Sequence, residues 1–228
     1  HCMSDRTDGG VRIEMTYSQF GQDDFVVDFF KNKKEGYFVD VGANFDGNDT
    51  RLLEEMGWDG ICIEPHNQCY DKLIKIRNCI CENVCVGHTE KEAVEFSENE
   101  GYTEALSGVL DYYSEEHKER ISNELQQMGG TQNIVNKKMT TLTSLLEKHN
   151  APSKIDYLKI DVEGGELNVF LGLDFSKYSF SLIQVEGNYE HEVNKIFSFL
   201  RENNYKPFVK VGIDIMFKPN HFEVTMGV

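Results

Sequence analysis

The residues best suited to chemistry begin at a glycine-rich turn. Asp40 and Gly42 end an apolar run, and Gly47 stands just before a helical pattern. Glycines in such a turn let the chain bend tightly and let a ligand approach the backbone. Glu64 follows Gly42 by 22 residues (64 − 42 = 22) and closes the next apolar run, where a carboxylate can accept hydrogen bonds from two ribose hydroxyls. This arrangement predicts a site for a cofactor that contains a nucleoside.

The residue at position 44 separates two classes of cofactor. A dinucleotide fold uses G-x-G-x-x-G because the middle glycine admits the pyrophosphate, and here that position is Asn44. The loop also lacks the Lys and Ser or Thr of a triphosphate-binding loop. A sulfonium cofactor carries a cation and an amino-acid tail in place of phosphate, and Asp40 suits its ammonium group. The loop therefore favours S-adenosylmethionine over a dinucleotide.

A second group of acids stands at the ends of two later strands. Asp161 and Glu163 follow one apolar run, and Glu186 and Asn188 end the next. Ligands of open α/β sheets lie at this edge. Asp161, Glu186 and Asn188 offer the oxygen ligands that Mg²⁺ or Mn²⁺ prefers, and such an ion would lower the pKa of an acceptor hydroxyl. Lys159 should point to the same face as Asp161 and can pair with the carboxylates.

Other interpretations of this region need no metal. Asp161 or Glu163 would act as a general base, or would orient an acceptor hydroxyl while its proton leaves. His191, at the start of a later helix, and His66 are further candidate bases, and of the two His66 is expected closer to the adenosine. In a purely structural interpretation, Glu163 and Glu166 cap the following helix. These alternatives stay open at the level of the sequence.

A scaffold of alternating strands and helices must bring these residues together. Apolar runs that alternate with helical patterns are typical of βα units on a parallel sheet, and so of an α/β protein. We expect helices over residues 18–31 (capped by Ser18), 49–56, 68–77, 115–128, 141–149, 166–171 and 190–203. We expect strands over residues 37–41, 60–64, 79–86, 94–96, 155–161, 180–186, 206–210 and 213–218.

The length of 228 residues and the hydrophobic content of 39% allow one domain with a sizeable core. Residues 1–16 are expected to form an N-terminal extension that opens with a cloning remnant, and residues 17–228 a single domain. Residues 98–136 break the rhythm of strands and helices. They predict an insertion that forms a cap or a substrate loop, or else a decorating surface helix.

The net charge of the chain indicates which classes of partner are expected. The chain has 23 Lys and Arg against 39 Asp and Glu, a formal charge of -16. Such a field repels phosphate backbones, so nucleic acid is not expected as a substrate. No run reaches the ~20 apolar residues that span a membrane, and no secretory signal opens the chain. A cytoplasmic protein is therefore expected.

Five of the six cysteines lie close together in the sequence: Cys62, Cys69, Cys79, Cys81 and Cys85. Zinc sites usually show C-x₂₋₄-C pairs presented by turns. Cys79, Cys81 and Cys85 instead fall in a run that alternates like a strand, and they are expected to share one face. Buried reduced thiols are the favoured interpretation.

Four ordered blocks resemble the FkbM family of methyltransferases, over nearly the whole chain from about Tyr17. The blocks are SQFGQD at 18–23, FVDVGAN at 38–44, IEP at 63–65 and LKIDVEGGE at 158–166. The resemblance implies a class I methyltransferase fold, a Rossmann-like seven-stranded sheet with an antiparallel last strand and helices on both faces, which binds S-adenosylmethionine. It also implies transfer to oxygen, commonly a hydroxyl of a sugar or of a glycosylated or polyketide product.

The predicted site combines cofactor-binding and catalytic residues. The predicted cofactor-binding residues are Gln19, Asp40, Gly42, Ala43, Asn44, Gly47, Glu64, Pro65, Asn83, Val84, Ser107 and Asp161. The predicted catalytic residues are Asp161, Glu163, Glu186 and His191. The resemblance suggests a small-molecule or glycan acceptor and is compatible with fusion to, or cooperation with, glycosyltransferases. The sequence does not indicate an oligomeric state.

Three functions compete on this basis. The first is an O-methyltransferase of a sugar or secondary metabolite. The second is a dinucleotide oxidoreductase, against which Asn44 counts. The third is a cofactor-binding module without catalysis that binds a partner through residues 98–136. The acids at both strand ends count against the third function, because an inactive site has no need of them.

Overall fold

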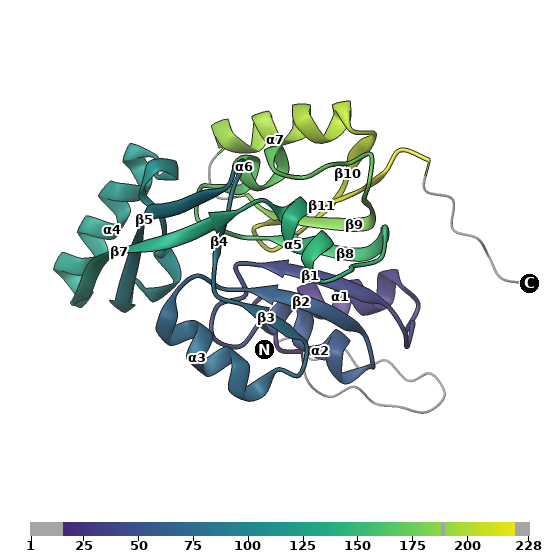
Figure 1. Ribbon diagram of the computed structural model, residues 1–228, viewed down its shortest axis with the longest axis horizontal. Coiled ribbons are helices and arrows are strands. Elements are labelled where there is room, and N and C mark those ends of the chain that lie inside the picture. Colours follow the sequence, from purple (N-terminus) through teal and green to yellow (C-terminus); the bar gives the residue numbers. More distant parts are fainter. Residues whose placement is uncertain (1–15, 188–189, 222–228) are drawn as a thin grey trace, which may run out of the picture.

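The computed structural model describes residues 16–187 and 190–221, and a seven-stranded sheet lies at its centre (Figure 1). The spatial order of the strands is β10-β11-β9-β8-β1-β2-β3. Their bounds are β1 (Tyr37–Val41), β2 (Asp59–Ile63), β3 (Ile80–Glu82), β8 (Lys154–Ile160), β9 (Ser179–Glu186), β10 (Tyr205–Val211) and β11 (Asp214–Pro219). Neighbouring strands are parallel except for β11, which runs antiparallel to both β9 and β10. The α/β class and the antiparallel last strand are therefore confirmed.

Helices cover both faces of this sheet, because alternate side chains of each buried strand point to opposite sides. Phe38 packs with α1 (Gln22–Phe29), α2 (Asn48–Glu55) and α3 (Asn67–Ile76). Val39 and Val41 belong to the opposite core. That core is closed by α5 (Leu142–Lys148), α6 (Glu166–Leu171) and α7 (Glu190–Glu202). The strands other than β11 thus have their carboxyl ends together at one edge of the sheet.

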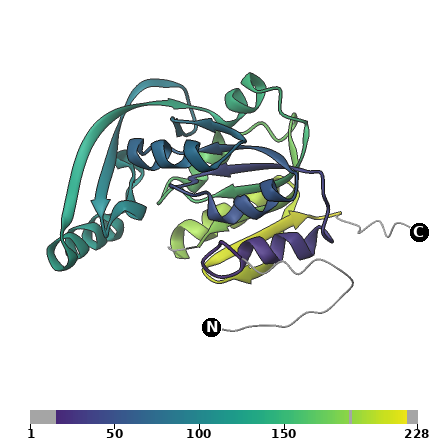
Figure 2. The ribbon, with the colours of Figure 1, turned by 90° about the horizontal axis from the view of Figure 1, so that it is seen from below.

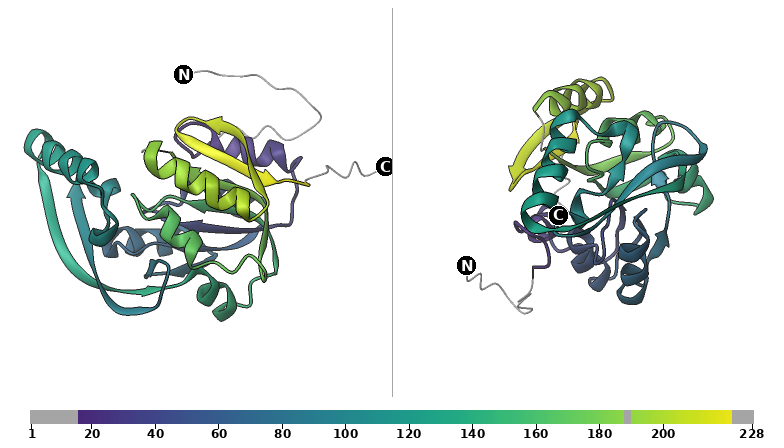
Figure 3. Two further views of the ribbon diagram at one scale, coloured as in Figure 1. Left: turned by 90° about the horizontal axis from the view of Figure 1, so that it is seen from above. Right: turned by 90° about the vertical axis from the view of Figure 1, so that its left-hand side faces the viewer.

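A second, four-stranded sheet projects from this edge (Figures 2 and 3). Its order is β4-β7-β5-β6, with β5 and β7 paired antiparallel over most of their length. We call residues 91–140 the arm. The elements of this region are β4 (Cys85–Val86), β5 (Lys91–Gly101), η1 (Glu104–Leu106), β6 (Gly108–Val109), η2 (Leu110–Tyr112), α4 (Glu115–Met128) and β7 (Gly130–Thr140).

The arm is longer than the sequence indicates. The strand predicted over 94–96 is the eleven-residue β5, and its partner β7 lies mostly in the segment without a predicted strand. Both strands are exposed over much of their length, and few of their side chains are apolar and buried. Their alternation is therefore weak, which hides them from a search for apolar periodicity. The predicted insertion 98–136 lies inside the arm.

The prediction of a single strand over residues 79–86 was wrong, because the chain turns between β3 and β4. The Asn83 side-chain amide donates hydrogen bonds to the carbonyls of Glu64 and Pro65, and β4 leaves the central sheet to pair with β7. Cys85 therefore packs against the arm and does not share a face with Cys79 and Cys81.

The described cysteines are free thiols that lie buried or half-buried. Cys79 and Cys81 pack with Cys62 in the core beneath α1 and α2, and the sulfur atoms of Cys62 and Cys79 lie 3.6 Å apart. Within residues 16–187 and 190–221, no helix is both long and apolar enough to cross a membrane.

The first helix also differs from its prediction. It begins at Gln22 behind Gly21, which adopts a left-handed φ of 79° and offers no side chain as a cap. The hydroxyl of Ser18, the predicted cap, donates a hydrogen bond to the buried carboxylate of Asp23. Ser18 is therefore not the N-cap residue, but its hydroxyl accepts the backbone N–H of Asp23 at 3.2 Å and so satisfies one free N–H group in the first turn.

Candidate functional site

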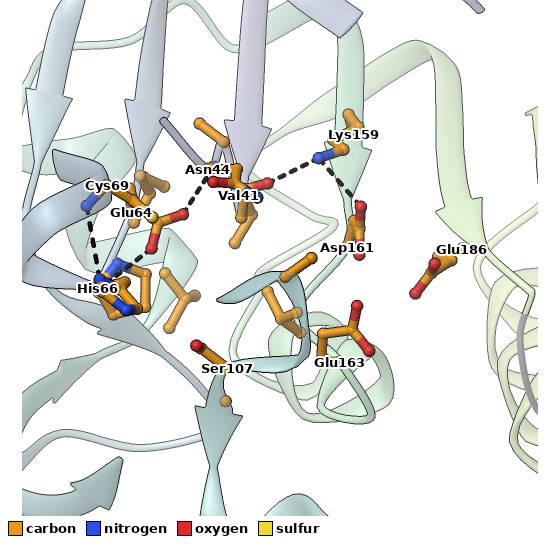
Figure 4. A pocket seen from close by; sticks show the side chains of 18 of the residues that line it. Val41, Asn44, Glu64, His66, Cys69, Ser107, Lys159, Asp161, Glu163 and Glu186 are labelled. Atoms are coloured by element: carbon orange, nitrogen blue, oxygen red, sulfur yellow. Dashed lines mark hydrogen bonds and ion pairs between the residues drawn. The ribbon is translucent and has the colours of Figure 1, made fainter. Parts of the chain in front are cut away.

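A cavity of about 270 Å³ opens where the carboxyl ends of the parallel strands meet the base of the arm (Figure 4). This edge is where ligands of open α/β sheets are expected. Its walls come from the loop after β1, the turn after β2, the loop after β8, the end of β9 and the arm. Of the predicted cofactor-binding residues, nine line it: Gln19, Gly42, Ala43, Asn44, Glu64, Pro65, Val84, Ser107 and Asp161.

The loop after β1 depends on close backbone packing. Gly42 has a φ of 82°, and a Cβ atom placed on it would lie 1.7 Å from the carbonyl oxygen of Asp161. Asn44 also has a left-handed backbone, with a φ of 55°, which asparagine tolerates better than most residues. Its backbone N–H donates to the Glu64 carboxylate at 2.7 Å. The loop is therefore fixed against both neighbouring strands, with its backbone facing the cavity.

Glu64 closes β2 at one end of the cavity. Its two carboxylate oxygens accept the backbone N–H groups of Asn44 and His66, each at 2.7 Å. Burial raises the pKa of Glu64 to about 7, although both hydrogen bonds act to lower it. A carboxylate has about four acceptor positions, so two remain for the hydroxyls of a ligand. Glu64 is thus both part of the turn and a wall of the cavity.

His66 does not have the free ring nitrogen of a general base. Its Nδ1 accepts the N–H of Cys69 at 3.5 Å and so caps α3, while Nε2 lies 2.9 Å from the carbonyl oxygen of Asn99. It is buried and connects α3 to β5 of the arm. Asn83, unlike His66, does not line the cavity, and its amide holds the turn after β2. Both residues position Glu64.

Asp40 and Gly47 lie beneath the cavity. Asp40 is fully buried, accepts a hydrogen bond from the Thr50 hydroxyl at 2.7 Å and lies 3.4 Å from Lys159 Nζ. This buried position of Asp40 does not agree with the predicted contact between its carboxylate and the ammonium group of the cofactor. Gly47 precedes α2 with a φ of 56°, and its carbonyl accepts a hydrogen bond from Arg77. Both residues therefore support the loop from below.

Lys159 connects the two acidic parts of the site. It is buried, donates to the carbonyl of Gly42 at 2.7 Å and lies 3.4 Å from both Asp40 and Asp161. Burial alone would lower its pKa, but Asp40, Asp161 and other nearby carboxylates raise the pKa well above its usual value. The predicted pairing of Lys159 with carboxylates is confirmed.

Carboxylates dominate the cavity wall. Among the described lining residues, Lys159 is the single Lys or Arg. It faces eight acids: Asp46, Asp49, Glu64, Glu104, Asp161, Glu163, Glu186 and Asp214. A narrow cleft lined by charges of one sign concentrates ions of the opposite sign. The cavity therefore favours a cationic ligand and disfavours a pyrophosphate.

At the other end of the cavity from Glu64, three acids converge (Figure 4). Each of Asp161, Glu163 and Glu186 offers one carboxylate oxygen, and these oxygens all lie within 4.8 Å of one another. We call this group the acidic triad. Burial and the neighbouring carboxylates raise the pKa of Glu186 to about 11 and that of Glu163 well above its usual value. The structure thus brings together the three predicted catalytic acids.

The arm reaches the acidic triad through His117 of α4. Its Nδ1 lies 3.7 Å from Glu163 Oε2, and its Nε2 lies 3.2 Å from the carbonyl oxygen of Leu106. Burial lowers the pKa of His117. No pattern in the sequence marks this histidine, because α4 is a charged helix whose position over the sheet is set by the arm.

Glu166 has the structural role that the sequence left open. Its carboxylate accepts the backbone N–H groups of Val162 and Gly164, at 3.2 and 3.1 Å, and so stabilises the turn before α6. Glu163 instead turns its side chain toward the cavity, with a left-handed φ of 56°. The predicted metal ligand Asn188 lies outside the described residues. His191 belongs to α7, but its side chain also lies outside the described part.

Several lining residues were not predicted. Asp49 and Asp214 sit at the floor, where the Gln184 amide donates to both, at 2.8 and 3.2 Å. Gln22 donates to Asp214 at 2.6 Å across 192 positions of the sequence. Gln22 comes from α1, Asp49 from α2 and Asp214 from the start of β11, and they meet through packing between distant parts of the chain, for which a single sequence carries no signal.

A family model and several solved structures match the chain. The model of the methyltransferase FkbM domain matches residues 40–207. No curated protein matches the chain. Among solved structures, the chain is similar to a ribosomal protein L11 methylase from Lactobacillus delbrueckii subsp. bulgaricus, with 11% identity, a TM-score of 0.44 and coverage of 86% of this chain and 74% of that one. It is also similar to a precorrin-6y C5,15-methyltransferase from Geobacter metallireducens GS-15, with 10% identity, a TM-score of 0.43 and coverage of 86% and 84%.

Proposed function

The chain belongs to the FkbM methyltransferase family and is an S-adenosylmethionine-dependent methyltransferase, and from this premise we propose that it methylates a hydroxyl of a sugar, a glycan or a glycosylated metabolite. One observation carries the proposal. The cavity has an acceptor for ribose at one end, Glu64, and an acidic triad without an assigned role at the other. The first end suits the donor, and the second is left for the acceptor.

The residues present fit the cofactor. When bound, S-adenosylmethionine supplies a methyl group on a positively charged sulfur. Gly42 and Ala43 leave bare backbone at the cavity wall, Glu64 can accept the ribose hydroxyls, and Pro65 and Val84 offer apolar surface for a base. The predominance of carboxylates favours the cationic donor. It opposes a dinucleotide, whose pyrophosphate would meet the same acids.

The acidic triad suits an acceptor that carries several hydroxyls. An ionised carboxylate only accepts hydrogen bonds, whereas a carboxyl kept protonated by a raised pKa, as in Glu186, can also donate one, and a sugar hydroxyl can pair with either. Asp161 is the natural proton acceptor, because its side chain is 33% exposed toward the cavity and is paired with Lys159. Glu163 and Glu186 would hold neighbouring hydroxyls. Alignment of the acceptor oxygen with the donor supplies much of the acceleration in such a transfer.

The formal charge of -16 supports an acceptor without a phosphate backbone. A small-molecule or glycan acceptor, cooperation with glycosyltransferases and a cytoplasmic location remain predictions from the sequence. His117 of the arm lies 3.7 Å from Glu163 of the triad, so the arm would contact the part of the acceptor beyond the reacting hydroxyl. We therefore place acceptor selection on the arm and donor binding on the central sheet.

The test measures transfer of a labelled methyl group to a panel of free sugars, nucleotide sugars and host metabolite extracts, with the product position read by mass spectrometry and NMR. In Asp161→Asn, turnover should fall by about 10²-fold to 10⁴-fold, the usual contribution of a general base, while donor binding changes little. Asp111→Asn, an exposed acid of the arm outside the cavity, is the matched control. Label found on nitrogen or carbon but not on a hydroxyl, or full turnover in Asp161→Asn, would overturn the proposal.

A further inference from the structure

We infer that the acidic triad, Asp161, Glu163 and Glu186, binds one divalent metal ion of the hard class represented by Mg²⁺ and Mn²⁺. This site differs from the one predicted from the sequence, in which Asn188 stood in place of Glu163. It goes beyond methyl transfer itself, since it concerns an ion and not the donor or the acceptor. Four features of the structure lead to it.

The first feature is geometry. The three ligand oxygens lie within 4.8 Å of one another. Two oxygens on opposite sides of an ion are about 4.2 Å apart at the metal–oxygen distance of Mg²⁺ and about 4.8 Å apart at that of Ca²⁺. Only one pair among three ligands can lie on opposite sides of an ion, and ligands at right angles are about 3.0 Å apart for Mg²⁺, so the three side chains must draw together to hold a small ion.

The second feature is an unsatisfied oxygen. Glu163 is 9% exposed, and its Oε2 is buried without a hydrogen-bond partner. His117 Nδ1, at 3.7 Å, is beyond hydrogen-bond distance. A buried carboxylate oxygen in this state is costly unless a cation or a donor reaches it. In Figure 4 this side chain is directed toward Asp161 and Glu186, which is where a shared ion would lie.

The third feature is the backbone that presents Glu163. Its φ of 56° belongs to the left-handed region, where glycine and asparagine are normally favoured. The next residue, Gly164, is also left-handed, and a Cβ atom there would lie 3.1 Å from the carbonyl oxygen of Tyr112. The arm thus fixes the turn in a shape that directs the glutamate side chain into the cavity.

The fourth feature is charge and donor type. Lys159 pairs with Asp161 but is shared with Asp40, so it cannot balance the three acids of the triad. All three donors are carboxylate oxygens, a set that selects Mg²⁺, Mn²⁺ or Ca²⁺ over zinc. Three protein ligands leave further positions for water or for acceptor oxygens. An ion at this place would stabilise negative charge that develops on an acceptor hydroxyl.

Titration of the full chain with Mn²⁺ alone, followed by electron paramagnetic resonance of the free ion, tests the inference. We expect one Mn²⁺ per chain, displaced by Mg²⁺. Glu163→Gln and Glu186→Gln should each weaken binding at least tenfold, and Glu116→Gln, an exposed acid of α4, should leave it unchanged. Circular dichroism melting identifies any variant that fails to fold. If one triad variant fails to fold, the Mn²⁺ affinity of the other triad variant tests the inference.

Two results would overturn the inference. One is the absence of bound Mn²⁺ at about 1 mM free ion, the weak end of the range for such sites, with and without S-adenosylhomocysteine. The other is wild-type affinity in both folded triad variants. The titration needs no acceptor and no turnover, so it can fail while the methyl-transfer assay succeeds, and the two proposals are separable.

Discussion

Protonation of Glu64 should switch off binding of the donor's nucleoside. Glu64 has a pKa of about 7 in the free protein because it is buried, and only its ionised form accepts hydrogen bonds from ribose through all its remaining positions. The sign follows directly: affinity is complete above this pKa and declines as the pH falls below it. 5′-Methylthioadenosine is a suitable ligand because it contains the ribose and the base but no amino-acid tail that titrates nearby.

The size of the effect follows from the ionised fraction. With a pKa of about 7, Glu64 is about 91% ionised at pH 8 and about 9% ionised at pH 6, and the apparent Kd is the intrinsic Kd divided by that fraction. The affinity should therefore fall about tenfold between pH 8 and pH 6. Glu64→Gln should weaken binding at pH 8 by about tenfold to a hundredfold, the range for lost hydrogen bonds to a charged group.

Isothermal titration calorimetry of the wild type and of Glu64→Gln, at intervals from pH 6 to pH 8, measures both effects. Asp49 also lines the cavity with a pKa raised to about 7 by burial, so the variant is needed to assign the titration. Glu64→Gln should bind with an affinity that changes little with pH. A flat profile in the wild type, or the same slope in the variant, would refute the role given to Glu64.

Two further predictions concern stability, and urea unfolding measures both. Gly42→Ala should lower the free energy of unfolding by several kcal/mol more than Gly21→Ala. The two glycines have similar φ values, 82° and 79°. A Cβ atom on Gly42 would lie 1.7 Å from the carbonyl oxygen of Asp161, whereas a Cβ atom on Gly21 would have nothing within 4 Å. Gly21→Ala carries only the left-handed backbone cost of about 1–2 kcal/mol, so equal losses would contradict the packing described here. Lys159→Met should lower the free energy of unfolding by about 3–5 kcal/mol, because it leaves carboxylates without their buried partner. Lys33→Met should lower it by about 1 kcal/mol or less, because the ion pair of Lys33 is half-exposed. Similar losses in the two lysine variants would show that the buried pair is not needed.

The central sheet and the two ends of the site could be predicted because they depend on local patterns. β1 and α6 have the predicted bounds, since a buried apolar run and a short helical turn are both complete in a few residues. Parallel strands place their carboxyl ends together, which is why Asp161, Glu163 and Glu186 meet as expected. The family resemblance supplied the antiparallel last strand, which periodicity alone did not specify.

The predictions that differ from the structure depend on partners far away in the sequence. Asp40 precedes the loop as an ammonium-binding acid would, but its register partner on β8 is Lys159, and that pairing holds the carboxylate below the cavity. His66 lines the cavity, but as a candidate base it disagrees with the structure, since its ring is used by α3 and by Asn99 of the arm. Neither neighbour can be identified before the strand order is known.

The arm leaves the central sheet and returns to it at one place. β4 pairs with the last residues of β7, and Lys91 at the start of β5 lies beside Met139 near the end of β7. Insertions or deletions in the outer part of the paired strands therefore leave these junctions, Glu64 and the loop after β1 in place. Related enzymes that share one donor can thus diverge in the acceptors they recognise by exchanging a single continuous segment of the gene.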